Sequence, residues 1–149
     1  MTIIVADASA IVALLLDNGA AGRWAAQALS GADLAAPHLL PFEVANVIRR
    51  HATARLIGHD VAEQSMADLA DLPIEYWPFE TLAPRVWALR PNLTSYDASY
   101  VALGELLKAP VATLDERIAK VRHLKSTVRS PRTWPTRTPN ERATAHPSL

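Results

Sequence analysis

The sequence predicts an α/β fold, a three-layer sandwich in which helices cover both faces of a central, mainly parallel sheet. Short apolar runs rich in β-branched residues, beginning with residues 2–6, alternate along the chain with longer segments of helical character. Turn-forming residues, among them the pair Asn18 and Gly19, separate these segments. The chain has 149 residues and half of them are hydrophobic, which is enough for one domain with a buried core.

Local signals place the elements in chain order. Pro41 suits the first turn of a long helix, and Gly58 is its stop signal. Asp60 can cap the helix that follows, and Pro73 ends that helix. The predicted strands are 2–6, 34–37, 74–77 and 111–114. The predicted helices are 9–17, 20–29, 42–56, 60–72, 81–89, 94–107 and 116–123.

Charge divides the chain unevenly, although its formal net charge is zero. Residues 1–116 hold seven basic and fourteen acidic residues, whereas residues 117–149 hold eight basic residues and one acidic residue. From residue 126 the chain is rich in proline and arginine and poor in aliphatic residues, which is typical of an extended or disordered tail. We therefore predict a folded domain over residues 1–125 and a tail over residues 126–149. The basic segment favours a polyanionic partner or self-association.

Composition excludes several classes of protein. Without cysteine, the chain cannot use disulfides, thiolate catalysis, zinc fingers or iron–sulfur clusters. Its longest stretch without Asp, Glu, Lys or Arg is nine residues, far below the roughly 20 apolar residues of a membrane span. The apolar N-terminus lacks a basic leader and carries Asp7, unlike a signal peptide. We expect a cytoplasmic protein with no membrane contact.

Four carboxylates stand at predicted helix starts. Asp7 and Asp115 each follow a strand and precede a helix, and Glu43 and Asp97 each lie in a first helical turn. Taken singly, each residue is explained by helix capping, because acids at this position accept from free backbone N–H groups and complement the helix dipole. The spacing of Thr94 and Asp97 is also that of a capping box.

Taken together, the four carboxylates indicate a metal site. In a parallel α/β sheet, strand ends and helix starts lie along one edge, where ligands bind. Carboxylates gathered there repel one another and couple their pKa values unless a cation balances them. Mg²⁺ and Mn²⁺ prefer oxygen ligands, so either ion suits this set.

The motifs around these acids resemble those of PIN-domain nucleases. The chain reads Asp-Ala-Ser at 7–9, Glu-Val-Ala-Asn at 43–46, Tyr-Asp-Ala-Ser-Tyr-Val-Ala-Leu at 96–103 and Thr-Leu-Asp-Glu-Arg at 113–117. Their order and spacing match the four acidic blocks of that family over roughly residues 2–124. Within it, the third block and the small size are similar to the VapC toxins of bacterial toxin–antitoxin pairs. One departure is that residues 123–128 poorly match the Gly-containing turn and last apolar strand that often end VapC chains.

The resemblance implies Mg²⁺-dependent hydrolysis of RNA phosphodiester bonds, with Mn²⁺ as a substitute. Asp7 and Asp97 are then the metal ligands, and Glu43 and Asp115 complete the acidic catalytic cluster. Side chains suited to hydrogen-bond these carboxylates are Ser9, Asn46 and Thr113. Basic residues placed to contact RNA phosphates are Arg117, Lys120 and Arg122.

The resemblance also implies two protein partners. One is a VapB-like antitoxin that blocks the acidic groove, and we expect apolar surface around Trp24 and over residues 48–56 to receive it. The other is a second copy of the chain, because toxins of this family pair two subunits around a shared groove.

Other enzymes and binding proteins also place acids at the edge of an α/β sheet. A haloacid dehalogenase-like phosphatase usually has a second Asp two residues after the first, but Ser9 occupies that position. A response-regulator receiver needs paired acids after its first strand, and the chain lacks them. A housekeeping PIN nuclease of RNA processing and a catalytically silent binding module are the remaining alternatives.

Overall fold

The computed structural model describes residues 2–120 and 128–131, and it confirms the predicted α/β class. Its sheet has five strands, in the order β3-β2-β1-β4-β5, and all neighbouring strands are parallel. The strands are β1 (Ile3–Ala6), β2 (Asp33–Pro37), β3 (Ile74–Trp77), β4 (Val111–Ala112) and β5 (Val128–Arg129). The helices of the described segments are α1 (Ala8–Leu16), α2 (Ala20–Leu29), α3 (Leu40–Thr53), α4 (His59–Asp71), α5 (Phe79–Ala88), α6 (Ser95–Leu107) and α7 (Glu116–Ala119).

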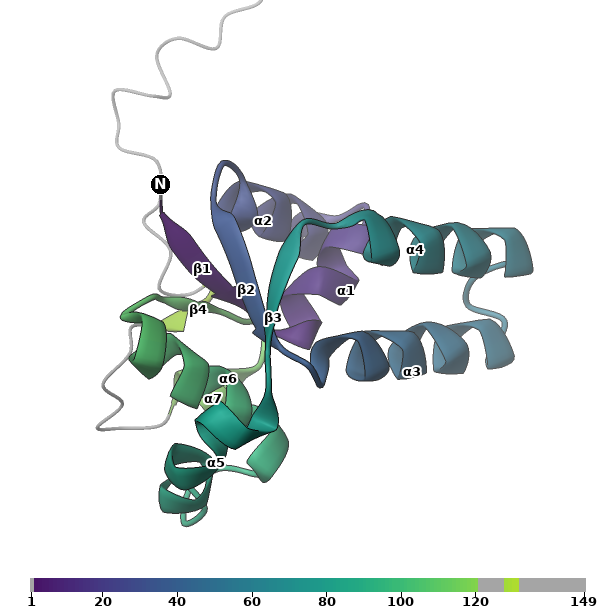
Figure 1. Cartoon of the computed structure of the whole chain (residues 1–149). Helices are drawn as coiled ribbons and strands as arrows, with labels where there is room; N and C mark the ends of the chain where they lie inside the picture. Colours follow the sequence, from purple (N-terminus) through teal and green to yellow (C-terminus); the bar gives the residue numbers. More distant parts are fainter. Residues whose placement is uncertain (1, 121–127, 132–149) are drawn as a thin grey trace, which may run out of the picture.

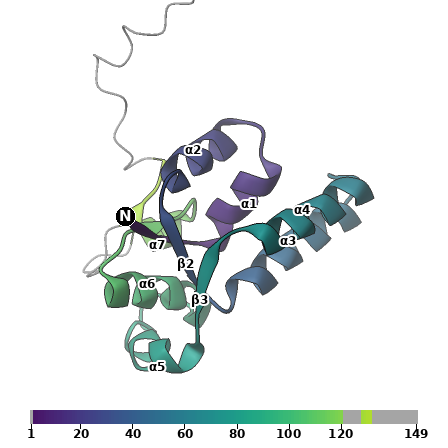
Figure 2. The same ribbon diagram turned by 45° about the horizontal axis from the view of Figure 1, so that its top comes forward.

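The helices form two outer layers around the sheet, so the predicted sandwich is confirmed (Figure 1). Helix α6 packs on one face against β1, β2 and β4, and α5 packs against α6. Helices α1 and α2 lie on the opposite face, which the turned view of Figure 2 separates from α6. Helices α3 and α4 form an antiparallel pair that contacts α1 and extends beyond the sheet.

The core explains why the two central strands are short and apolar. In β1, Val5 and Ala6 are fully buried, and both residues of β4 are fully buried as well. A strand covered by helices on both faces carries apolar residues without alternation. Both strands therefore place polar residues only where they end, at the carboxyl edge of the sheet, and this edge is where the candidate site forms.

Several helix boundaries differ from the sequence prediction by one to three residues, and α3 and α4 are examples. Helix α3 starts at Leu40 and ends at Thr53, earlier at both ends than the predicted 42–56. Helix α4 is capped by Gly58 and not by Asp60, because the Gly58 carbonyl accepts the helical hydrogen bond from the N–H of Ala62. Asp60 lies inside the first turn, where its charge still complements the helix dipole.

The fifth strand lies in the segment that the sequence predicts as a tail. Val128 pairs with Val111, and Arg129 pairs with Ala112, in parallel register. The N–H of Thr113 donates to the carbonyl of Arg129 at 3.0 Å. The sheet therefore continues past the predicted boundary at residue 125, although the local sequence is a poor strand. No helix of the described segments is long and apolar enough to cross a membrane.

Candidate active site

Four carboxylates from distant parts of the sequence line one cavity of about 690 Å³. Asp7 follows β1 and Asp115 is the N-cap residue of α7, shortly after β4. Glu43 and Asp97 lie in the first turns of α3 and α6. Because β1 and β4 are parallel neighbours, the residues that follow them emerge side by side at the same edge. The topology thus brings the four predicted acids to one place.

Asp7 is the most deeply placed of the four, with 5% of its surface exposed. Two hydroxyls donate to its Oδ2 atom: Ser9 Oγ at 2.6 Å and Thr113 Oγ1 at 2.7 Å. Backbone N–H groups of Leu114 and Asp115 donate to these hydroxyl oxygens at 3.0 and 2.9 Å. Ser9 and Thr113 therefore hold the Asp7 carboxylate, which makes no side-chain capping hydrogen bond to its helix.

Burial is the largest influence on the pKa of Asp7. It raises the pKa of the carboxyl above its ordinary value of 3.8, while the Ser9 and Thr113 hydrogen bonds partly oppose this effect. The negative charge of Asp97 raises the pKa further. Keeping Asp7 ionised without a cation therefore costs the folded protein free energy.

Glu43 is half-buried and accepts a hydrogen bond from the fully buried Tyr100, whose hydroxyl lies 2.6 Å from Glu43 Oε1. Burial raises the pKa of Glu43, and the charges of Asp7 and Asp97 raise it further. The hydrogen bond from Tyr100 acts in the opposite direction. The charges of both predicted metal ligands thus act on Glu43. The side chain that holds its carboxylate, Tyr100, comes from a different helix, α6.

Asp97 combines a capping position with a place in the cavity. Its N–H donates to Thr94 Oγ1 at 3.2 Å, so Thr94 caps α6 as predicted. Burial raises the pKa of the Asp97 carboxyl, and Asp115 raises it further, whereas Arg117 lowers it. The Asp97 carboxyl thus interacts with Asp115 and Arg117, and its charge also raises the pKa values of Asp7 and Glu43.

Asp115 and Arg117 both line the cavity, and we call this pair its rim. Its Oδ1 accepts from the backbone N–H of Arg117 at 2.8 Å, and its Oδ2 accepts from Arg117 Nη2 at 2.7 Å. This guanidinium holds the pKa of the Asp115 carboxyl below its ordinary value. Asp115 is therefore a helix cap as well as a wall of the cavity.

Two residues with predicted roles make contacts outside the acidic cluster, and a third is not among the described residues. Asn46 lines the cavity, and the side-chain hydrogen bond that the structure gives it among the described residues is the one its Oδ1 accepts from Arg49 Nε at 3.0 Å, so its expected hydrogen bond to a carboxylate stays a prediction. The two residues are three positions apart on α3 and therefore face the same way. Lys120 pairs with Glu116 at 3.1 Å. Arg122 lies outside the described residues.

The cavity also has an apolar side, beyond the carboxylates. Its apolar lining comes from α1, α3 and the turn before α4: Val12, Leu16, Val47, Leu56 and Ile57. Trp24, expected to be on an apolar surface, is instead 8% exposed and belongs to the core. Ile48 is likewise buried and belongs to the same core cluster. Leu56, with 70% of its surface exposed, is the part of the predicted surface that is accessible.

The donor set fits a hard divalent cation held partly through water. Among the residues described, no three His, Cys, Asp or Glu side chains are arranged to enclose one ion. Mg²⁺ is often bound by only one or two carboxylates and keeps several waters, so it does not need such an enclosure. The cavity supplies oxygen donors that repel one another, and a cation would relieve that repulsion.

Comparison with known proteins gives the family. Residues 4–124 match the PIN domain. Ribonuclease VapC9 of Mycobacterium tuberculosis is 37% identical over 116 residues, which are 78% of this chain and 88% of that protein. Ribonuclease VapC12 of the same organism is 36% identical over 117 residues, which are 78% of this chain and 90% of that protein. The chain belongs to the VapC ribonuclease family of PIN domains.

Solved structures of VapC proteins have the same fold as this family member. VapBC2 from Rickettsia felis, bound to a DNA fragment from its promoter, matches with a TM-score of 0.62 and 12% identity over 87% of this chain and 98% of that chain. Mycobacterium tuberculosis VapC20, a sarcin-ricin loop cleaving toxin, matches with a TM-score of 0.61 and 15% identity over 78% and 92% of the two chains. At these identities the likeness concerns the fold.

Tyr100 is the site residue that sequence reasoning missed. It lies three residues after Asp97, inside a helix whose neighbouring residues are small or aliphatic, and it reads there as an ordinary core aromatic. The available signal was its hydroxyl, because a buried tyrosine O–H usually needs a hydrogen-bond partner. The sequence does not show that this partner comes from another helix of the VapC fold.

Proposed function

We propose that this VapC-family protein is a divalent-metal-dependent endoribonuclease and the toxic component of a toxin–antitoxin pair. The observation that carries the proposal is the cavity lined by four carboxylates, three of which have raised pKa values. Relatives named as VapC ribonucleases, 36–37% identical to this chain over most of its length, support the reaction class.

Asp7 and Asp97 would hold Mg²⁺, or Mn²⁺ in its place, and Glu43 and Asp115 would complete the acidic surface. When bound, such an ion stabilises charge on phosphoryl oxygens and lowers the pKa of water. The chain's own contribution is to orient the ligands. Ser9 and Thr113 fix Asp7 by two short hydrogen bonds, so that its carboxylate needs little reorganisation.

Arg117 and Lys120 would contact the RNA backbone beside this site, as the sequence also suggests for Arg122. Their side chains are 74% and 70% exposed, although each pairs with an acid of its own helix or its cap. The exposed pair of Lys120 with Glu116 contributes little stability, so Lys120 can exchange its carboxylate for a phosphate. Such contacts position RNA without reading its sequence.

The test of the reaction class is cleavage of a mixed RNA pool by the purified chain, freed of any partner. We expect cleavage that EDTA abolishes and that Mg²⁺ or Mn²⁺ restores, and no cleavage by the Asp7→Asn variant. Cleavage that survives EDTA would overturn the metal assignment. A folded wild-type chain that binds RNA but never cleaves it would favour a silent binding module.

The toxin role requires a partner that closes the cavity. Its apolar lining, which includes Val12 and Leu16, fits the apolar face of an amphipathic antitoxin segment. A basic residue of a VapB-like antitoxin would then offset the charge of the acids. We expect growth arrest when the chain is expressed alone and recovery when the neighbouring small gene is co-expressed. Normal growth with an RNA-cleaving chain would favour a housekeeping nuclease.

The proposal includes a homodimer, which the apolar surface of the chain supports. Phe42, Phe79 and Trp87 have 77%, 64% and 67% of their surfaces exposed. Large exposed apolar side chains favour an interface when they are contiguous. Light scattering after size exclusion should give twice the chain mass of 16.2 kDa, and the mass of a single chain would remove the dimer from the proposal.

A further inference from the structure

The hydroxyl of Tyr100 lies at the meeting point of three elements of the candidate site. It donates to Glu43 Oε1 on α3 at 2.6 Å. The backbone N–H of Ala8, at the start of α1, lowers the pKa of this phenol, and the charge of Asp7 raises it. Tyr100 itself is on α6, with none of its surface exposed. One buried side chain therefore interacts with, or belongs to, the segments that carry Asp7, Glu43 and Asp97.

We propose that Tyr100 is a positioning residue, whose phenol O–H fixes the Glu43 carboxylate relative to Asp7 and Asp97 in the metal-binding cavity. This inference rests on the proposed metal-dependent function. It concerns how the carboxylate is held, and it assigns Tyr100 no contact with substrate or metal.

The geometry of α6 supports the role. Asp97 and Tyr100 are three residues apart, so they lie on neighbouring positions of one helical face. The helix thus carries one predicted ligand directly and holds Glu43 through the tyrosine. Because Tyr100 is enclosed by the core, its ring has little freedom, and the hydrogen bond transmits that rigidity to a carboxylate on α3.

Two of the other acids are held by side chains other than Tyr100. Asp7 is held by two hydroxyls and Asp115 by a guanidinium. Among the described residues, the hydrogen bond from Tyr100 is the one side-chain hydrogen bond that the structure gives to Glu43. A glutamate also has more rotatable bonds than an aspartate, so it loses more conformational entropy when it is fixed.

The test is Mn²⁺ binding to the full chain, measured by calorimetry or by electron paramagnetic resonance, in wild type and Tyr100→Phe. Removing a residue that orients a metal ligand commonly weakens metal affinity by about 10- to 100-fold, and we expect about tenfold here. The matched control is Tyr76→Phe, which removes the hydroxyl of a half-buried tyrosine on β3, outside the residues that line the cavity. We expect the control to leave the affinity unchanged.

A double variant separates positioning from a general effect on stability. If Tyr100 acts through Glu43, then Tyr100→Phe should change Mn²⁺ affinity less than twofold in a Glu43→Gln background. With RNA as substrate, Tyr100→Phe should lower kcat at intermediate Mn²⁺ and leave the KM for RNA unchanged. A lower Tm with unchanged Mn²⁺ affinity would show a structural role and overturn the inference.

Two further outcomes keep the conclusions distinct. If wild type neither binds Mn²⁺ nor cleaves RNA, the proposed function fails, and the positioning role fails with it. If wild type does both and Tyr100→Phe behaves identically, only the positioning role fails. Should Tyr100→Phe not fold, Glu43→Asp withdraws the carboxylate from the phenol while keeping its charge, and unchanged Mn²⁺ affinity in that variant would overturn the inference.

Discussion

Asp7 and Asp115 occupy matching places in the fold, after parallel neighbouring strands and at the starts of helices, yet their charges are treated in opposite ways. Asp7 is held by two neutral hydroxyls, and burial raises its pKa. Asp115 is held by the guanidinium of Arg117, and its pKa is lowered. Among the described residues, the side-chain partners of the Asp7 carboxylate are neutral, whereas Asp115 pairs with the cationic Arg117.

This difference indicates what distinguishes an acid that only caps a helix from an acid that is suited to bind a metal. A capping acid is balanced by backbone N–H groups and nearby cations, as Asp115 is. A buried acid whose hydrogen-bond donors are all neutral is still destabilised in its ionised form, and a nearby cation would stabilise that form. The deep region, formed by Asp7, Glu43 and Asp97, is thus suited to recruit a metal, and the rim formed by Asp115 and Arg117 is suited to meet an anionic substrate.

The largest effect is expected from Asp7→Asn. This change should reduce RNA cleavage by at least about 100-fold, because it removes charge from a predicted metal ligand. The variant should be at least as stable as the wild type without metal, since it removes a buried carboxylate that burial destabilises. Cleavage rates and Tm values measure both effects. Asp33→Asn, an exposed acid at the start of β2, is the control, and near wild-type cleavage by Asp7→Asn would refute the assignment.

A smaller loss is expected from Thr113→Val, which removes one hydroxyl from Asp7 and keeps the side-chain shape. Metal affinity should fall about tenfold, as is usual when a partner of a metal ligand is removed. Stability should fall by about 1–2 kcal/mol, because Thr113 is fully buried and its oxygen also accepts from a backbone N–H. Mn²⁺ titration and urea unfolding measure the two effects. Thr81→Val, at an exposed position of α5, should change neither.

The stability of the fold should depend on pH in opposite ways through the deep acids and through Asp115 at the rim. The raised pKa values of Asp7, Glu43 and Asp97 mean that the metal-free folded state binds protons more tightly than the unfolded state. Their stabilising contribution is full below the ordinary values of 3.8 and 4.5 and is lost as the pH rises through the raised values. The free energy of unfolding of Asp7→Asn should therefore gain on that of the wild type as pH rises above about 4.

This prediction is measured by urea unfolding of both proteins in EDTA, from pH 4 to pH 8. Asp115 works in the other direction, since its lowered pKa stabilises the fold above 3.8, and this contribution is lost as the pH falls through the lowered value. A constant difference between Asp7→Asn and wild type at every pH would contradict the raised pKa of Asp7.

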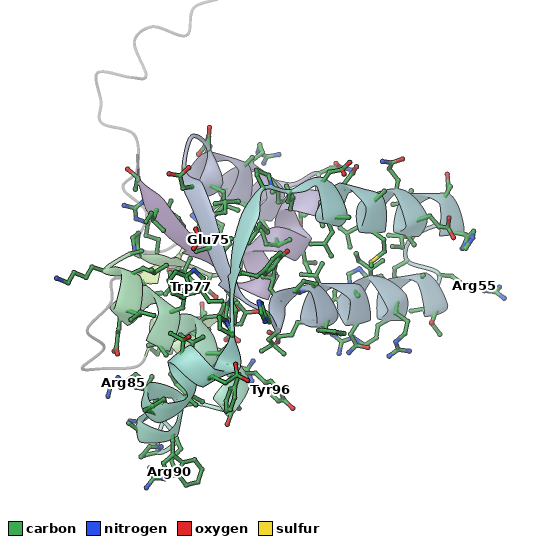
Figure 3. The ribbon with its side chains drawn as sticks, in the orientation of Figure 1. Arg55, Glu75, Trp77, Arg85, Arg90 and Tyr96 are labelled. Atoms are coloured by element: carbon green, nitrogen blue, oxygen red, sulfur yellow. The ribbon has the colours of Figure 1, made fainter. Side chains whose placement is uncertain are left out.

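At the rim, Arg117→Gln should strengthen the binding of Mn²⁺ and weaken the binding of RNA. Without the guanidinium the cavity is more negative, so Mn²⁺ should bind about two- to fivefold tighter, which is the range expected for an exposed charge. The KM for RNA should rise by a similar factor at low salt. The control is Arg90→Gln, which removes the same charge from the end of α5 (Figure 3). Weaker Mn²⁺ binding by Arg117→Gln would argue against the rim role.

The smallest effect is expected from deleting residues 132–149. The deletion removes Arg132, Arg137 and Arg142 and leaves β5 in place. Affinity for RNA should fall about threefold at low salt and the salt dependence should weaken, because fewer counterions are released. Turnover at saturating RNA should stay the same. Deleting residues 127–149 instead also removes β5, so a lower Tm in that variant alone would show that the strand contributes to the domain.

The sequence was sufficient for much of this architecture because its signals are local. Helix α2 and strand β3 were predicted with their observed bounds, since turn residues flank both. The carboxylates could be assigned to one sheet edge because a parallel sheet puts every strand end on the same side. Strand β5 was not predicted, since two residues without periodicity become a strand only by pairing with β4.

Partners across the fold were beyond the reach of the sequence. The motifs already suggested that Ser9 and Thr113 hold a carboxylate, because both stand beside acids in the chain. The bond from Tyr100 to Glu43 spans 57 residues, so no local pattern predicts it. Residue type and spacing thus determined which acids gather, since the residues that follow parallel strands share one edge of the sheet. Burial and long-range contacts determined which of them remain uncompensated, because desolvation and hydrogen bonding depend on three-dimensional surroundings.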